Sequence, residues 1–187
     1  MKSIIDLKSN SVHPSTALQL AAYTLLDGDV EFDDGRHIYR DELGFVLPSV
    51  TGILKSEGFI DTTFYTEHGR DRGSMVHLAC HYDDLDDLDE TTLDIQIEPY
   101  LMAYRRFKKE TGFKVEKSEQ PMRSTIHGFA GTPDKIGTFP QGNIQRAAVE
   151  LHRGGTYKLI EYKNRNDLKI FLSALAVYQW KQNNLRR

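Results

Sequence analysis

Apolar and polar residues alternate at the start of the chain and predict a short strand over residues 3–8. This strand ends on polar residues, and a helical pattern follows over residues 17–26. Ser15 or Thr16 is the expected N-cap, because a hydroxyl group can accept a hydrogen bond from a free amide of the first helical turn. The chain is therefore expected to open with a strand, a loop and a helix.

Three further helical patterns follow along the chain. Apolar positions suit a helix over residues 65–82, and an acidic stretch over residues 83–90 then breaks the pattern. The next helix is expected to begin near Pro99, which is tolerated in a first turn, and to end at Gly112. Asn166 is the expected cap of a last helix. The apolar face of that helix is expected to consist of Leu168, Phe171, Leu172, Leu175 and Tyr178.

Strand patterns occupy much of the second half of the chain. Residues 113–122 and 129–139 are expected to form two strands, separated by a polar turn. Residues 146–152 and 157–163 flank a pair of glycines, which is a good hairpin signal. These strands and the helices around them predict a mixed class of fold.

Residues 37–40 and 45–50 carry a weaker pattern, which fits a small hairpin or an extended arm. No internal repeat interrupts the succession of strands and helices. The pattern as a whole predicts an α/β fold of the α+β kind, with a mixed central sheet flanked by helices.

Length and composition limit the classes of protein to be considered. With 187 residues and 39% hydrophobic content, the chain is expected to form a single domain over residues 1–187. Cys80 is the only cysteine, which excludes an intramolecular disulfide and a four-cysteine zinc or iron–sulfur site within one chain. No apolar run reaches membrane-spanning length, and the first residues lack a signal-peptide pattern, so a cytoplasmic protein without a membrane partner is expected.

The net charge of −3 gives no indication of nucleic-acid binding. DNA binding would therefore depend on local clusters of basic residues, for which solvated helix faces or a frayed tail are an equally good interpretation. The clusters are Arg105, Arg106, Lys108 and Lys109, and, at the end of the chain, Arg186 and Arg187.

Three residues have the chemistry that phosphodiester hydrolysis requires, namely carboxylates for a divalent cation and a nearby ammonium group. Asp6 and Lys8 are two apart in the first strand, so their side chains project from the same face. Asp134 follows Gly131 and two further residues, in a setting where small residues allow close approach. Alone, the Asp-x-Lys triplet is also compatible with a solvated strand end, and Asp134 with a simple turn.

Two helical positions add weaker candidates. Gln19 and Tyr23 are four apart and share a helix face, where they could contact a phosphate or form an ordinary surface pair. His77 follows Arg72 and Gly73 on a predicted helix, and its imidazole can complete a metal site, although a lone helix histidine is more often structural.

Together these motifs resemble those of RecB-like nucleases in the PD-(D/E)XK superfamily. The motifs are Gly73-x-x-x-His77, Gly131-x-x-Asp134, Asp6-x-Lys8 and Gln19-x-x-x-Tyr23. The segment IIDLKSNSVHPSTALQLAAYTLL is similar to the acid-x-lysine strand and following helix of phage exonucleases in this group, and RHIYRDELGFVLPSVTGIL and YKLIEYKNRNDLKIFLSALAVYQWK resemble the beginning and end of such proteins. The resemblance implies a restriction-endonuclease-like fold and exonucleolytic hydrolysis of linear double-stranded DNA in phage recombination or DNA processing.

The resemblance also implies roles for individual residues. Asp134 and Asp6 would bind Mg²⁺ or Mn²⁺, with His77 and the Leu7 carbonyl as further metal ligands. Lys8 would orient the attacking water and offset charge on the phosphate.

The same resemblance implies what the protein contacts. Gln19, Tyr23 and Arg72 would contact the DNA substrate. A single-strand annealing protein and further copies of the chain are the other candidate partners, and a phage-encoded protein would act in the host cytoplasm.

The motifs occur in an order that differs from that of the family. The strand and helix at residues 1–28 would follow the histidine helix and the Gly-x-x-Asp strand, which here lie in residues 29–142, and residues 143–187 would complete the domain. Moving residues 1–28 between Gly142 and its successor restores the family order, so we interpret them as a transposed segment. Asp6 is then expected to reach Asp134 through strand pairing.

A rival assignment respects chain order, because Glu161-x-Lys163 follows Asp134 and precedes a helix with Tyr178. Against this rival, Ala174 occupies the place four before Tyr178 where the family has glutamine. Two other functions also remain open: a structure-selective endonuclease with the same centre, and a catalytically silent DNA-binding module, which the rearranged order makes more plausible.

Overall fold

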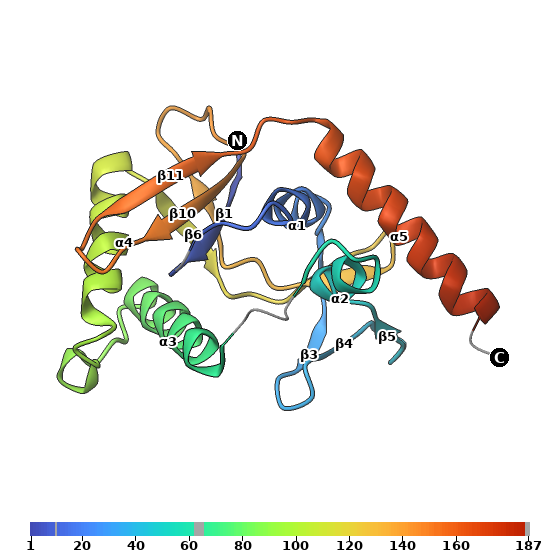
Figure 1. The fold of residues 1–187 in the computed structure, drawn as a ribbon, viewed down its shortest axis with the longest axis horizontal. Coiled ribbons are helices and arrows are strands. Elements are labelled where there is room, and N and C mark those ends of the chain that lie inside the picture. Colours follow the sequence, from blue (N-terminus) through green and yellow to red (C-terminus); the bar gives the residue numbers. More distant parts are fainter. Residues whose placement is uncertain (10, 62–65, 186–187) are drawn as a thin grey trace. The chain divides into compact units, whose positions relative to one another are not determined.

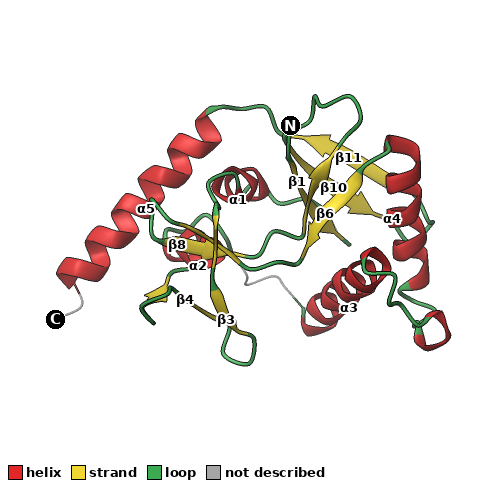
Figure 2. Cartoon of the chain, turned by 180° about the vertical axis from the view of Figure 1, so that it is seen from behind, coloured by secondary structure: helices red, strands yellow, loops and turns green. Residues whose placement is uncertain are grey.

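The computed structural model describes residues 1–9, 11–61 and 66–185. Within these residues the chain has an α+β fold with five α-helices, a mixed five-stranded sheet and two small antiparallel three-stranded sheets (Figure 1, Figure 2). The prediction of an α+β fold with a mixed central sheet is therefore confirmed. No helix in the described segments is long and apolar enough to cross a membrane.

The chain divides into two compact units, each built from three segments. The first unit consists of Met1–His13, Thr63–Glu119 and Asp134–Tyr162. The second consists of Pro14–Thr62, Gln120–Pro133 and Lys163–Arg187. The single domain expected from the sequence stays a prediction.

The first unit contains the five-stranded sheet, in the order β11-β10-β1-β9-β6. The N-terminal strand β1 lies in the middle of the sheet, parallel to β10 and antiparallel to β9. Its neighbours are therefore the two strands that precede and follow the turn at Gly142 in the sequence. The strands are β1 (Ser3–Lys8), β6 (Lys114–Ser118), β9 (Lys135–Thr138), β10 (Arg146–Leu151) and β11 (Tyr157–Glu161).

Two helices cover one face of this sheet through an apolar core. They are α3 (Glu67–Asp84) and α4 (Glu98–Thr111), and a short 3-10 turn, η1 (Glu90–Thr92), lies between them. Ile5 and Leu7 of β1 are fully buried in the same apolar cluster as Phe107 of α4, because alternate residues of a strand face the same side. Gly112 ends α4 in the left-handed conformation with φ 67°, as its place after the helical pattern predicts. Tyr65, the expected start of the helix that became α3, lies outside the described residues.

The two strands predicted over residues 113–122 and 129–139 are each broken in two. β6 continues after a gap as β7 (Met122–Ser124), and β8 (Phe129–Gly131) continues as β9. β6 pairs with β9 in the first unit, whereas β7 pairs with β8 in the second. The continuous strands were thus a wrong prediction, because Glu119 has a positive φ of 49° and Pro121 has no amide hydrogen for a sheet.

The second unit contains three helices and two small sheets. Strand β2 joins β7 and β8 in one sheet, and the expected hairpin pairs β4 with β5 in the other. The strands are β2 (Gly28–Asp29), β3 (Glu31–Asp33), β4 (Ile38–Arg40) and β5 (Val46–Leu47). The helices are α1 (Thr16–Tyr23), α2 (Val50–Ser56) and α5 (Asn166–Leu185).

Ser15 occupies the N-cap position of α1, as expected, but the expected capping contacts of Ser15 and Asn166 differ from the prediction. Ser15 precedes α1, but its backbone is itself helical and its side chain makes no capping hydrogen bond. Asn166 is the first residue of α5, and its amide donates to the side chain of Asn164 at 3.0 Å. The side chain of Asn164, and not that of Asn166, therefore accepts a hydrogen bond from the first turn of α5.

Replacing Gly137 with alanine is expected to destabilise the first unit by about 1–3 kcal/mol. A methyl group there would overlap the backbone carbonyl oxygen of Lys114 on the paired strand and lie 2.7 Å from the Phe113 ring. Gly154→Ala is the matched control, because no atom lies within 4 Å of the added methyl group. Urea unfolding of both variants measures the difference, and equal stability would contradict the close approach of β6 and β9.

Candidate functional site

Strands β1 and β9 bring Leu7 and Asp134 together at one end of the central sheet. Antiparallel pairing places Ile5 opposite Lys135, so Asp134 lies just beyond the paired residues. The backbone amide of Leu7 donates a hydrogen bond to Asp134 Oδ2 at 2.6 Å. The strand pairing expected between the Asp6 segment and Asp134 is therefore present.

The imidazole ring of His77, on α3, lies next to Leu7 and Asp134. Its Nδ1 lies 3.2 Å from Glu119 Oε1 and 3.7 Å from Asp134 Oδ1. Its other ring nitrogen, Nε2, lies 3.0 Å from the Leu7 carbonyl oxygen. His77, Glu119 and Asp134 offer ligand atoms within 4.8 Å of one another, a spacing that could hold a metal ion.

Glu119 is the member of this group that sequence reasoning missed. It lies inside a stretch predicted as one continuous strand and belongs to no recognised motif. Its positive φ ends β6, and its amide donates to the Asp134 carbonyl oxygen at 2.9 Å, which keeps the two acidic residues adjacent. Pro121, two positions later, was the available signal that the strand would break near Glu119.

Asp6 and Lys8 form a close ion pair on β1, beside the group of three. Asp6 is only 1% exposed, and Lys8 Nζ lies 3.0 Å from its Oδ1 and 2.8 Å from its Oδ2. Among the described residues Oδ2 nevertheless accepts no hydrogen bond of good geometry. The Lys8 ammonium group, at this distance, therefore offsets the charge of the buried carboxylate.

Burial and neighbouring charges shift the protonation of the buried groups. Burial raises the pKa of Asp6 to about 6, an effect that Lys8 opposes and Asp134 reinforces. Burial also raises the pKa of Asp134, with His77 opposing and Glu119 reinforcing the change. Burial disfavours the charged imidazole of His77, but Asp134 and Glu119 outweigh it and raise its pKa to about 9. Negative charge therefore dominates around Nδ1 of His77, which favours a bound cation.

Arg72 lies on α3, five positions before His77, and its side chain is half-buried. It therefore shares a helix with a candidate metal ligand. Its expected contact with DNA stays a prediction.

The two other expected DNA contacts, Gln19 and Tyr23, lie on α1 in the second unit. Gln19 Nε2 donates to the Tyr23 hydroxyl at 2.8 Å, so the pair interacts as its spacing suggests. The ring of Tyr23 is buried, and a methyl group on Gly131 would lie 2.6 Å from it. The glycine of the Gly-x-x-Asp motif thus allows a close approach, and the group that approaches it is the ring of Tyr23.

The rival pair Glu161 and Lys163 lies elsewhere in the chain. Glu161 ends the edge strand β11 and pairs with Ala147 of β10, which separates it from β1. Two strand spacings correspond to about 10 Å. Lys163 is exposed and belongs to the second unit. The structure therefore groups Asp6 and Lys8 with Asp134 and leaves Glu161 apart.

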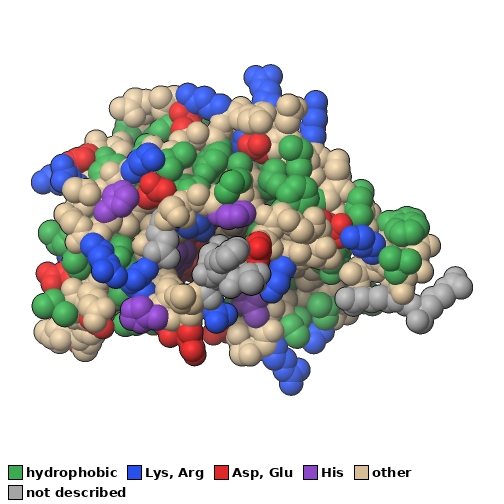
Figure 3. Space-filling view, in the orientation of Figure 1, with side chains coloured by type: hydrophobic (Ala, Val, Ile, Leu, Met, Phe, Trp, Pro, Cys, Tyr) green, Lys and Arg blue, Asp and Glu red, His purple; other side chains and the backbone are tan. Residues whose placement is uncertain are grey.

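The basic cluster on α4 is largely engaged in ion pairs. Arg105 lies 2.6 Å from both Asp83 and Glu90, and Lys108 contacts Asp83 at 2.9 Å. On the face drawn in Figure 3, Lys and Arg side chains are interspersed with Asp and Glu. The alternative of a solvated, ion-paired helix face therefore fits this cluster better than DNA contact, while Arg186 and Arg187 lie outside the described residues.

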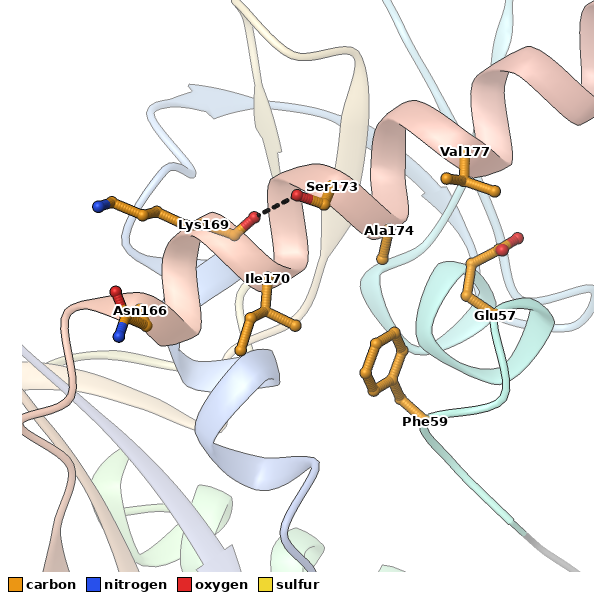
Figure 4. A pocket seen from close by; sticks show the side chains of 8 residues that line it. All are labelled: Glu57, Phe59, Asn166, Lys169, Ile170, Ser173, Ala174 and Val177. Carbon is orange, nitrogen blue, oxygen red and sulfur yellow. Dashed lines mark hydrogen bonds between the residues drawn. The ribbon is translucent and has the colours of Figure 1, made fainter.

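A separate open pocket of about 590 Å³ lies in the second unit, between α5 and the end of α2. Figure 4 shows Ile170, Ala174 and Val177 of α5 pointing toward Phe59. Glu57 at its edge pairs with Lys181 at 2.7 Å. The only carboxylate among its described lining residues, Glu57, is already paired, and Lys169 adds a positive charge, so this pocket does not provide a metal site.

Comparisons of the chain with protein-family models and with curated proteins found no significant match. A functional assignment must therefore be based on the residues and their geometry.

Proposed function

We propose that this chain is a metal-dependent DNA nuclease of the RecB-like type in the PD-(D/E)XK superfamily, acting as an exonuclease on linear double-stranded DNA. The observation that carries the proposal is the meeting of Asp6, Lys8, His77 and Asp134 at one end of one sheet. These residues come from three separate motifs that the sequence had already associated with this chemistry.

The available donor atoms fit Mg²⁺ or Mn²⁺. Carboxylate oxygens suit both ions, and the group supplies two carboxylates beside one imidazole nitrogen. Asp134, Glu119 and Nδ1 of His77 would hold the ion, with Asp6 beside them. The Leu7 carbonyl contacts the opposite ring nitrogen of His77 and would orient the ring, a common arrangement for metal-binding histidines. Direct ligation by the Leu7 carbonyl stays a prediction.

The side chains provide distinct parts of the hydrolysis. A bound divalent ion supplies Lewis-acid stabilisation of a phosphoryl oxygen and a water of lowered pKa. The Lys8 side chain is 28% exposed, so its ammonium group can reach a phosphate at the surface while Asp6 holds it in place. Lys8 would orient the attacking water and offset the negative charge that develops on the phosphate.

The position of β1 supports the interpretation of residues 1–28 as a transposed segment. β1 lies between β9 and β10, the strands on either side of the turn at Gly142. The Ile4 amide donates to the Gln145 carbonyl oxygen at 2.8 Å, so the start of the chain lies close to that turn. Strand neighbours can thus be preserved although the sequence order differs.

The experiment that tests the proposal is incubation of the protein with end-labelled linear duplex DNA and with covalently closed circular duplex. We expect release of nucleotides from the linear duplex with Mg²⁺, none with EDTA, and no cleavage of the circle. Cleavage of the circle would instead indicate an endonuclease. Binding of DNA without cleavage under any metal condition would indicate a silent DNA-binding module.

Mn²⁺ is expected to raise the melting temperature of the protein by about 5–10 °C when present at roughly 100 times its dissociation constant, because a ligand of the folded state stabilises it by about 2.7 kcal/mol. Differential scanning fluorimetry with Mn²⁺, and then with excess EDTA, measures the shift and its reversal. An unchanged melting temperature in Mn²⁺ would argue against a metal site formed by His77, Glu119 and Asp134.

A further inference from the structure

A fully buried lysine follows the proposed metal ligand Asp134 directly in the sequence. Lys135 is 0% exposed, and its Nζ lies 2.9 Å from Asp84 Oδ2 and 2.6 Å from Ser118 Oγ. Charged lysine side chains are almost never buried unless they are paired. Lys135 therefore connects α3, through Asp84, to the end of β6, through Ser118.

The two partners of Lys135 are themselves held in place. Asp84 also accepts hydrogen bonds from the Tyr104 hydroxyl at 2.9 Å and from Lys108 Nζ at 2.8 Å. Ser118 Oγ lies 2.8 Å from Nδ1 of His81, which is one helical turn beyond the metal-site histidine on α3. Two residues of α3 are thus connected to Ser118 of β6, His81 directly and Asp84 through Lys135.

Each connected residue is close in sequence to a proposed metal ligand. Lys135 follows Asp134 at the start of β9, and Ser118 precedes Glu119 at the end of β6. Asp84 lies on the same helix as His77. The three segments that carry the proposed ligands are therefore the three segments that Lys135 joins.

We propose that Lys135, Ser118 and Asp84 act as positioning residues that set the distances among the three proposed metal ligands, an inference that rests on the proposed metal site. The apolar contacts of α3, through Val76 and Ala79, are non-directional and permit small shifts along the sheet. Hydrogen bonds between charged groups are directional and favour one geometry. A metal site requires its donor atoms to lie within about 0.5 Å of the positions that the ion needs.

The test measures binding of Mn²⁺ alone, from the electron paramagnetic resonance signal of the free ion, together with the melting temperature. The variants are Lys135→Met, which removes the central cation, and Ser118→Ala, which removes only a hydroxyl group. Lys108→Met is the matched control, because it removes another cation from the same Asp84 carboxylate but touches neither β6 nor β9. We expect roughly tenfold weaker Mn²⁺ binding for Lys135→Met, a change in the same direction for Ser118→Ala, and unchanged binding for Lys108→Met.

The outcomes separate this inference from the proposed function. Unchanged Mn²⁺ binding in folded Lys135→Met, or equal weakening in Lys108→Met, overturns the positioning role while leaving the metal site intact. If Lys135→Met does not fold, Ser118→Ala replaces it in the test, and unchanged Mn²⁺ binding in folded Ser118→Ala overturns the positioning role. Failure of the wild type to bind Mn²⁺ overturns both the metal site and the positioning role.

Discussion

Replacing Lys8 with alanine is expected to slow Mg²⁺-dependent cleavage of linear duplex DNA by roughly 10²–10³-fold, the usual effect of removing one group that stabilises developing charge. Lys8 is the only cation that the described structure places within 4 Å of Asp6, and it lies on the same strand face. No other described side chain at this position replaces its charge. Initial rates with and without EDTA measure the effect.

Lys163→Ala is the control for Lys8→Ala, because Lys163 is the lysine of the rival motif. We expect it to retain the wild-type rate, since Glu161 lies two strands away from β1. If Lys163→Ala loses cleavage and Lys8→Ala keeps it, the catalytic residues are Glu161 and Lys163, and not Asp6 and Lys8. The melting temperatures of both variants show whether a lost rate reflects a lost fold.

Asp134→Asn is expected to abolish the Mn²⁺-induced rise in melting temperature and to slow cleavage by roughly 10³-fold, because a metal ion contributes several kcal/mol to stabilising such a transition state. The amide has nearly the shape of the carboxylate, and its oxygen can still accept the hydrogen bond from Leu7. The substitution therefore removes the charge while retaining the contact between β1 and the start of β9.

Asp87→Asn is the matched control for Asp134→Asn. It removes the same charge from an exposed position in the same unit, and it should leave both the Mn²⁺ effect and the cleavage rate unchanged. An Asp134→Asn protein that still melts at a higher temperature in Mn²⁺ would show that the ion binds elsewhere.

The two predictions examine different parts of the proposed chemistry. Lys8→Ala leaves His77, Glu119 and Asp134 in place, so Mn²⁺ should still bind although cleavage is slow. Asp134→Asn should lose both properties. A variant of Lys8 that loses metal binding as well would mean that the ion pair with Asp6, and not only the ammonium charge, holds the site together.

Local patterns in the sequence were sufficient to predict several strands and helices and to identify several candidate site residues. The alternation over residues 3–8 predicted β1, and with it the shared face of Asp6 and Lys8, because a strand has a period of two. The glycine pair predicted the hairpin of β10 and β11, since glycine permits the turn. His77 and Asp134 were named from motifs of a few residues each.

Other features depend on partners that are distant in the sequence. Glu119 joins the site because β6 ends just before it and its amide donates to the carbonyl oxygen of Asp134. Gly131 accommodates the ring of Tyr23, which no motif specifies. Lysine is normally a surface residue, so the burial of Lys135 could not be expected from the sequence.

The sequence by itself thus determined part of the secondary structure, such as β1, the hairpin of β10 and β11, and the helices α1, α3, α4 and α5, and which residue types could carry hydrolytic chemistry, since both depend on neighbours within a few positions. Tertiary structure alone decided which of these residues meet. His77 and Glu119 are 42 positions apart, and Leu7 and Asp134 are 127 apart. Their proximity follows from the order of strands in the sheet and the packing of α3, and such long-range pairings are set by the burial of the whole core and not by local preference.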